Sequence, residues 1–357
     1  MSDVLINVGR TRDSLQTSGR RVSWSKIQQY ENCPGNWLVA NHAAFIDRTD
    51  YTDDSIHAIP GTLLQRVWEA IINERIYRRD GFNDPRALCL WAGRQIEALF
   101  DCIVRPLEQQ HKQDKSQWRG YFHSETGKVE LAALAEAHGL DPTLRSHLQP
   151  KFAQLGRLFA LHGGRAAFFG QLAATFPPTL TTLAKAGLDL DGLKAESFVT
   201  AQSGDMDLAG GIDFIWNRRR SASGYFDDLK LLDDGYVMLD GKYRLGRTVK
   251  MGQLEFYAAL LQLAYGKKPS RLGFLCYTTA ELKFRDFSDR MTTAILARAS
   301  LQYDGASAIM SALIDHLASS HTHVVTPIGQ IPSLTLTPSQ LACRFCGISK
   351  SCNARAT

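Results

Sequence analysis

Two aspartates and a lysine stand where short β-strands are predicted to end. Asp213 lies in GGIDFIW, and Asp240 lies in YVMLDGKY directly after three apolar residues. Lys242 follows Asp240 by two positions, so the two side chains are expected to point the same way. Two carboxylates can hold a hard divalent cation such as Mg²⁺, which lowers the pKa of a bound water. Lys242 could orient that water or neutralise charge on a phosphate.

A second Asp-x-Lys sequence, Asp228 and Lys230, competes for the same interpretation. It lies in FDDLKLLDDG, where the acidic pairs are typical of solvated hairpin positions. The run before Asp240 is more continuously apolar, which favours Asp240 and Lys242. Asp-x-Lys alone is a weak motif, because most instances are surface ion pairs.

A helix is predicted over residues 253–266, QLEFYAALLQLAYG, with Gly266 as its C-terminal glycine. Gln253 and Tyr257 lie four positions apart and therefore share one face. Their amide and phenol could contact a nucleotide strand by hydrogen bonding and stacking. The alternative is a helix flank that packs on the core.

Four cysteines stand near the two ends of the chain: Cys33, Cys343, Cys346 and Cys352. Thiolates bind iron–sulfur clusters and also tetrahedral Zn²⁺, and the spacing alone does not distinguish these metals. The other three cysteines occupy apolar segments and are expected to be buried small side chains.

Composition limits the class of protein. The 357 residues are 44% hydrophobic and 22% charged, which is ordinary for a soluble globular protein of one large domain or two smaller ones. No stretch approaches the roughly 18 apolar residues of a membrane span, and the N-terminus does not look like a secretory signal, so we expect a cytoplasmic protein. The net charge of +5 and a dense basic segment over 218–271 permit a polyphosphate partner, although a solvated surface has the same pattern.

The elements that would position these residues alternate between helix and strand. Helices are predicted over 23–31, from Gly61 onward, over most of 86–186, and over 290–320. Strands are predicted in ESFVTAQ, LAGGIDFIW, GYFDDLKLL, GYVMLDGKY and RLGFLCYT, and near residue 125. This order favours a compact α/β unit preceded by a large helical segment.

Together these motifs resemble the RecB-like branch of the PD-(D/E)XK nuclease superfamily. The likeness rests on Gly-x-x-Asp, then Asp-x-Lys, then Gln-x-x-x-Tyr, and on SWSKIQQYENCP, which is similar to that branch's S-x-S-x-I-x-x-Y-x-x-C-P signature. The cysteine spacing resembles the iron-staple subset, which includes AddB-type and CRISPR-associated RecB-like exonucleases. The likeness covers roughly residues 22–72 and 196–357.

The resemblance implies an α/β fold with a restriction-endonuclease-like core, in which helices flank a mixed central sheet. It further implies a large helical insertion and a cysteine cluster that clamps the two ends together, closing a very long loop. The expected parts are the start of the nuclease domain (1–72), the insertion (73–195), the catalytic core (196–290) and a C-terminal helix with the cysteine segment (291–357).

The resemblance also implies roles for individual residues. The catalytic set would be Asp213, Asp240 and Lys242, with Mg²⁺ or Mn²⁺. The substrate-positioning residues would be Gln253, Tyr257, Arg244 and Arg247. The four cysteines would hold a [4Fe–4S] cluster, with Zn²⁺ as the alternative.

One position departs from the family pattern. The family usually places a metal-binding histidine four residues after the glycine that corresponds to Gly61, whereas this chain has Gln65. A glutamine oxygen is a weaker ligand than a charged group, and His57 or Glu196 could compensate.

The implied activity is a metal-dependent deoxyribonuclease that cuts single-stranded DNA from an end, in recombination, repair or processing. The alternative is a nuclease-like DNA-binding or complex-assembly subunit whose site has decayed at Gln65. In either case the helical insertion could shape a strand channel or dock a protein partner. A third class, an iron–sulfur redox sensor, has no supporting motif.

Overall fold

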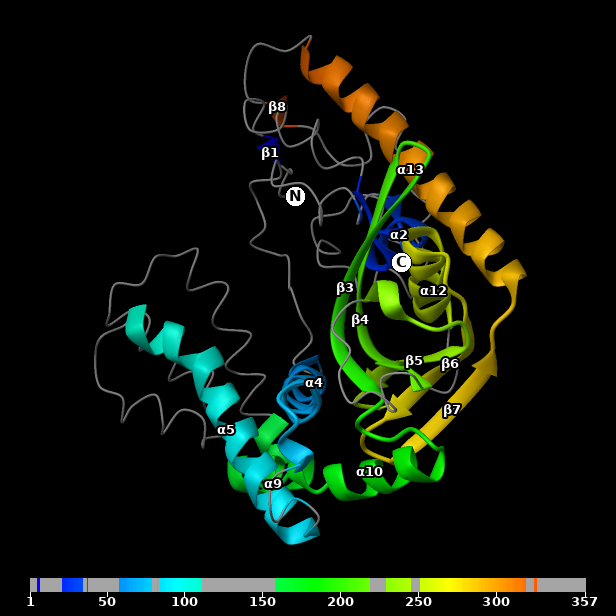
Figure 1. Ribbon diagram of the computed structural model, residues 1–357. Helices are drawn as coiled ribbons and strands as arrows, with labels where there is room; N and C mark the ends of the chain where they lie inside the picture. Colours follow the sequence, from blue (N-terminus) through cyan, green and yellow to red (C-terminus); the bar gives the residue numbers. More distant parts are fainter. Residues whose placement is uncertain are drawn as a thin grey trace.

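A computed structural model describes most of the chain as a layered α/β arrangement (Figure 1). The described residues are 5–6, 21–34, 37, 58–78, 82, 84–110, 158–218, 229–244, 251–318 and 324–325. Two short strands, β1 (Leu5–Ile6) and β8 (Val324–Val325), form an antiparallel pair separate from the main sheet.

A mixed sheet of six strands lies at the centre of the described part. Its strands are β2 (Arg21–Val22), β3 (Leu193–Ser203), β4 (Met206–Trp216), β5 (Tyr236–Lys242), β6 (Pro269–Cys276) and β7 (Glu281–Asp286). The order is β2-β4-β5-β6-β7, with β3 also paired to β4. β5 and β6 run parallel, as do β2 and β4, whereas the other pairs are antiparallel.

Helices cover both faces of this sheet (Figure 1). One face carries α4 (Ala58–Asn73), α5 (Pro85–Gln110), α9 (Arg165–Ala173) and α10 (Phe176–Lys185), and the buried residues between these helices and the sheet are called the first core. The other face carries α2 (Trp24–Asn32), α12 (Gly252–Tyr265) and α13 (Asp289–Ala318), which enclose the second core. The helices predicted within 86–186 thus share one core with the sheet wherever the structure describes them.

Local signals place several helix ends where the sequence predicts them. The Ser23 hydroxyl accepts a hydrogen bond from the Lys26 N–H at the start of α2, which satisfies a backbone donor of the first turn. α12 ends at Gly266, whose backbone is left-handed with φ of 68°. The strands predicted around Asp213, Asp240 and residues 271–278 are also confirmed as β4, β5 and β6.

Two element predictions are wrong in detail. α4 begins at Ala58 rather than at Gly61. Pro60 is accommodated because the first helical turn needs no N–H at that position. Residues 229–231 form a 3₁₀ turn, η2 (Leu229–Leu231), rather than a strand. Leu229 and Leu232 are buried three positions apart, and the Leu232 N–H donates to the Leu229 carbonyl. That spacing and hydrogen bond suit a 3₁₀ turn.

The regular alternation of side chains reverses in the middle of the β3–β4 hairpin. Ala195 packs in the first core, whereas Val199, four positions later on the same strand, packs in the second. On β4, Ile212 belongs to the second core and Phe214 to the first. Side chains two or four positions apart on a regular strand share one face, so both strands must deviate near Glu196.

The strand predicted near residue 125 lies outside the described residues. No helix among those that the structure describes is both long enough and apolar enough to cross a membrane.

Candidate functional site

A cavity of about 610 Å³ lies between α4, the middle of the β3–β4 hairpin and the end of β5. It brings together residues from segments that are far apart in the sequence: Gly61, Thr62, Gln65, Arg66, Glu196, Asp213, Gly241, Lys242, Tyr243 and Arg244. Carboxylates, a lysine and arginines therefore surround one space, as a site for a cation and a phosphate requires.

Asp240 and Lys242 lie on the same side of β5, as the sequence predicts. Asp240 is only 1% exposed, and its Oδ2 atom is 2.6 Å from Lys242 Nζ. The Lys242 ammonium and the Asp213 carboxyl are polar partners of this carboxylate. Burying a carboxylate is costly, and the Lys242 ammonium offsets only part of the cost.

Asp213 comes from β4 and is joined to the end of β5 by a backbone hydrogen bond. The Gly241 N–H donates to Asp213 Oδ2 over 2.8 Å, which sets the Asp213 carboxylate beside Asp240. Burial, together with the charge of Asp240, raises the pKa of Asp213 to about 8. Burial also raises the pKa of Asp240, although Lys242 opposes that shift. Without a cation, the Asp213 carboxyl therefore retains its proton at neutral pH.

Glu196 is a third carboxylate at the cavity and comes from β3. The register of the flanking pairs, Ala195 with Phe214 and Ser197 with Ile212, puts Glu196 opposite Asp213. Its backbone has a positive φ of 50°, which is uncommon for a residue with a side chain. Such strain persists only where surrounding contacts impose it, and it is concentrated at functional sites.

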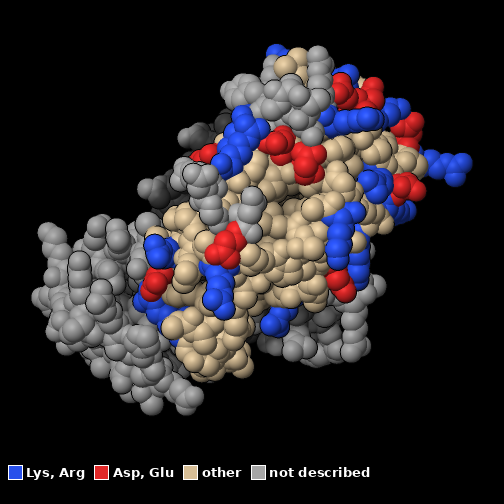
Figure 2. Space-filling view, turned by 60° about the horizontal axis from the view of Figure 1, so that its bottom comes forward, with Lys and Arg blue, Asp and Glu red and all other residues tan. Residues whose placement is uncertain are grey.

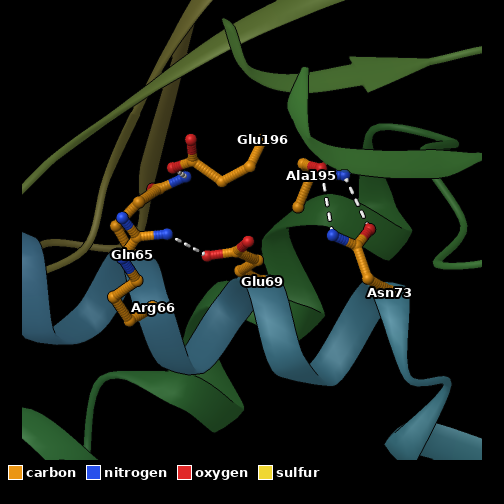
Figure 3. Close-up of polar contacts among 6 residues, drawn as sticks. All are labelled: Gln65, Arg66, Glu69, Asn73, Ala195 and Glu196. Carbon is orange, nitrogen blue, oxygen red and sulfur yellow. Dashed lines mark hydrogen bonds and ion pairs between the residues drawn. The ribbon is translucent and has the colours of Figure 1, made fainter. Parts of the chain in front are cut away.

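Helix α4 supplies the contacts that hold β3 in this conformation (Figure 3). The Asn73 side chain donates to the Ala195 carbonyl over 3.1 Å and accepts from the Ala195 N–H over 3.2 Å. Eight residues earlier on α4, Gln65 Nε2 donates to Glu196 Oε1 over 3.2 Å. The helix thus fixes both the backbone before Glu196 and the carboxylate itself.

Gln253 and Tyr257 on α12 reach the site through Lys242. Lys242 Nζ donates to Gln253 Oε1 over 3.1 Å, and Gln253 Nε2 donates to the Tyr257 hydroxyl over 3.1 Å. Tyr257 is buried against Gly210, and burial raises its pKa to about 12, so it stays neutral. These contacts give both residues a role in positioning the lysine, and their contact with a nucleotide strand stays a prediction.

Tyr277, which sequence reasoning missed, lies directly after β6 and is buried beneath Gly241. Its hydroxyl donates to Gln65 Oε1 over 2.6 Å. A Cβ atom on Gly241 would lie 2.0 Å from that hydroxyl oxygen and 2.9 Å from Gln65 Oε1. The glycine between Asp240 and Lys242 is the only sequence signal of this close approach.

We expect Gly241→Ala to destabilise the protein by about 1–3 kcal/mol, because the new methyl group must displace the Tyr277 hydroxyl. Gly211→Ala is the matched control on the neighbouring strand, since a Cβ atom there meets nothing within 4 Å. Chemical denaturation of both variants measures the difference. Equal free energies of unfolding would contradict the close approach.

The acidic residues fit a hard divalent cation. Asp213 and Asp240 place two buried carboxyl groups close together, and burial raises the pKa of each, a shift that a nearby cation would oppose. Carboxylate oxygens are the ligands that Mg²⁺ and Mn²⁺ prefer. The Gln65 oxygen already accepts a hydrogen bond from the Tyr277 hydroxyl.

The other predicted site residues are only partly described. Arg244 lines the cavity, and its guanidinium lies 5.3 Å from the centre of the Tyr243 ring. On the face shown in Figure 2, lysines and arginines lie next to acidic side chains rather than in one continuous basic patch. Arg247 and His57 lie outside the described residues.

Cys33 is the one described member of the predicted cysteine cluster. It caps the C-terminal end of α2 and is buried. Cys343, Cys346 and Cys352 lie outside the described residues, and within the described ranges no group of three or more histidine, cysteine or acidic residues is placed so that it could hold a metal ion.

No known protein family matches this chain, and no curated protein is significantly similar to it.

Proposed function

We propose that this protein is a metal-dependent deoxyribonuclease with a PD-(D/E)XK site of the RecB-like type. The observation that carries the proposal is that Asp213 and Lys242 line one cavity, while the buried Asp240 carboxylate forms an ion pair with Lys242 directly behind it. The mixed sheet with helices on both faces is compatible with a restriction-endonuclease-like core.

Asp213 and Asp240 would hold the cation, and the Gly241 carbonyl could add a ligand. When bound, the cation would activate a water molecule and offset the negative charge that develops on the phosphate. Lys242 Nζ, held between Asp240 and Gln253, would neutralise part of the same charge. Arg66 and Arg244 line the same cavity and could hold the phosphate backbone of a strand.

An iron–sulfur clamp formed by Cys33, Cys343, Cys346 and Cys352 is part of the same proposal, with Zn²⁺ as the alternative metal. It rests on the cysteine pattern of the sequence. The buried position of Cys33 at the end of α2 is compatible with a structural role.

The test is a digest of end-labelled single-stranded and double-stranded DNA with Mg²⁺, Mn²⁺ or EDTA. We expect shortened products with either cation and intact DNA in EDTA, because the carboxylates need the ion to engage a phosphate. The product ladder would give the direction of cleavage. Intact DNA with both cations would refute the nuclease.

A second candidate is a DNA-binding or assembly subunit without cleavage. It is favoured by the engagement of the Gln65 oxygen with Tyr277, which leaves the site without the neutral ligand that the family places there. This candidate predicts DNA affinity that falls with salt, together with no cleavage under any divalent cation.

A further inference from the structure

One aromatic side chain lies exposed on the same strand as Glu196. Phe198 on β3 is 67% exposed, and no other aromatic side chain in the part of the chain that the structure describes is as open to solvent. Tyr257, which the sequence predicts to contact a nucleotide strand, is buried in the second core instead. Single exposed apolar side chains are common on protein surfaces, so it is the position of Phe198 that gives its exposure a meaning.

The pairing of β3 with β4 puts Phe198 next to the cavity. Phe198 pairs with Gly211, and two positions away along the two strands stand Glu196 and Asp213, which line the cavity. Val199 packs in the second core, so Phe198 faces the opposite side of the sheet, where the cavity lies. Two residues of a strand span about 7 Å, which places the ring one such step from the cavity.

The surface beside Phe198 is open. A Cβ atom on Gly210 would lie 2.5 Å from the Tyr257 ring, so Gly210 faces α12 and the adjacent Gly211 faces the other side of the sheet. A Cβ atom on Gly211 would meet nothing within 4 Å. Figure 1 shows the β3–β4 hairpin continuing past α4. The ring and the glycine therefore form a low apolar surface with room for a planar group.

Polar groups that suit a phosphate backbone lie on both sides of this surface. Arg66 and Arg244 line the cavity on one side. On the other side, a hollow of about 490 Å³ is lined by residues that include Arg21, Thr200 and Asp207, and Thr200 is two positions beyond the ring on β3. Arginines on either side of an aromatic ring suit an extended nucleotide strand, because arginine binds phosphates and the ring stacks on bases.

We infer that Phe198 is a base-stacking residue that holds one nucleotide of single-stranded DNA beside the cavity, an inference that rests on the proposed function of this site. Each base of a single strand offers an open face to the ring, whereas a base of a duplex would first have to leave its stack. The ring therefore selects single strands, while the arginines bind the phosphates of either form. A base held at Phe198 also fixes the position of the neighbouring phosphate in the cavity.

Fluorescence anisotropy with labelled oligonucleotides in EDTA tests this inference without relying on cleavage. We expect Phe198→Ala to weaken the binding of single-stranded DNA by about 10-fold, the effect typical of losing one base–aromatic stack, and to leave duplex binding unchanged. Phe198→Trp should bind single strands at least as tightly as the wild type, because the indole keeps a stacking face. Leu301→Ala is the matched control, since Leu301 is 70% exposed on α13, on the other face of the sheet, and it should bind like the wild type.

Two further measurements separate stacking from charge. Phe198→Ala should keep the wild-type dependence of affinity on salt, whereas Arg66→Ala should reduce that dependence because it removes a phosphate contact. A single strand made entirely of abasic nucleotides should bind Phe198→Ala and the wild type alike, because it has no base to stack on the ring.

Equal affinity of Phe198→Ala and the wild type for single-stranded DNA, or no binding of single strands by either, would overturn the inference. Unchanged DNA affinity together with an altered oligomeric state would assign the ring to a protein contact, which overturns it as well. Wild-type protein that binds single strands through Phe198 but cuts no DNA with Mg²⁺ or Mn²⁺ would refute the nuclease alone.

Discussion

Lys242→Ala should lower the rate of divalent-dependent DNA cleavage by about 10²–10³-fold, the effect typical of removing one group that stabilises charge in a transition state. Its Nζ atom is the only cationic group within ion-pair distance of Asp240 among the described residues, and Gln253 holds it in place. The loss should appear in kcat rather than in KM, because a group that acts mainly in the transition state contributes little to ground-state binding.

Two controls show whether slower cleavage reflects a lost catalytic group rather than misfolding or the loss of any one positive charge. Lys230→Ala changes the lysine of the other Asp-x-Lys sequence, whose side chain is exposed in η2, and should cut DNA at the wild-type rate. Mn²⁺ titration of Lys242→Ala should still show binding, since the carboxylates remain. Cleavage by Lys242→Ala at the wild-type rate would exclude Lys242 from the catalytic set.

The metal-free protein should lose stability as the pH rises from about 5 to 8. The pKa of Asp213 rises from 3.8 to about 8 on folding, so the folded chain keeps a proton that the unfolded chain releases. The stability associated with that proton is complete below pH 3.8 and is lost as the pH rises through 8. The loss amounts to at most about 1.4 kcal/mol for each pH unit in that window.

Thermal unfolding in EDTA at several pH values measures this effect. Asp213→Asn should flatten the decline and stabilise the metal-free protein at pH 8, because its amide carries no charge beside Asp240. Asp205→Asn, in the exposed turn between β3 and β4, should keep the wild-type profile. Adding Mn²⁺ should restore wild-type stability at pH 8, since the cation replaces the proton. A wild-type profile in Asp213→Asn would show that another group controls the pH dependence.

Local signals were enough to predict where several candidate site residues lie on their strands and helices. Asp240 and Lys242 share a side because a strand repeats every two residues, and that rule holds along β5. α12 follows from its apolar pattern and from the glycine at its end. Gln253 and Tyr257 share a face of α12, as their spacing predicts, but their contacts with Lys242 depend on how the helix lies on the sheet.

The sequence by itself therefore determined β4, β5, β6 and α12 and the chemical types at the ends of the strands, because period, caps and turns are local properties. Only the tertiary structure decided how Glu196 faces Asp213, since both strands reverse their alternation at that point and no local pattern records it. The tertiary structure also decided the role of Gln65. Its partner Tyr277 is 212 positions away, and only the fold of α4 onto the sheet brings the hydroxyl to the amide.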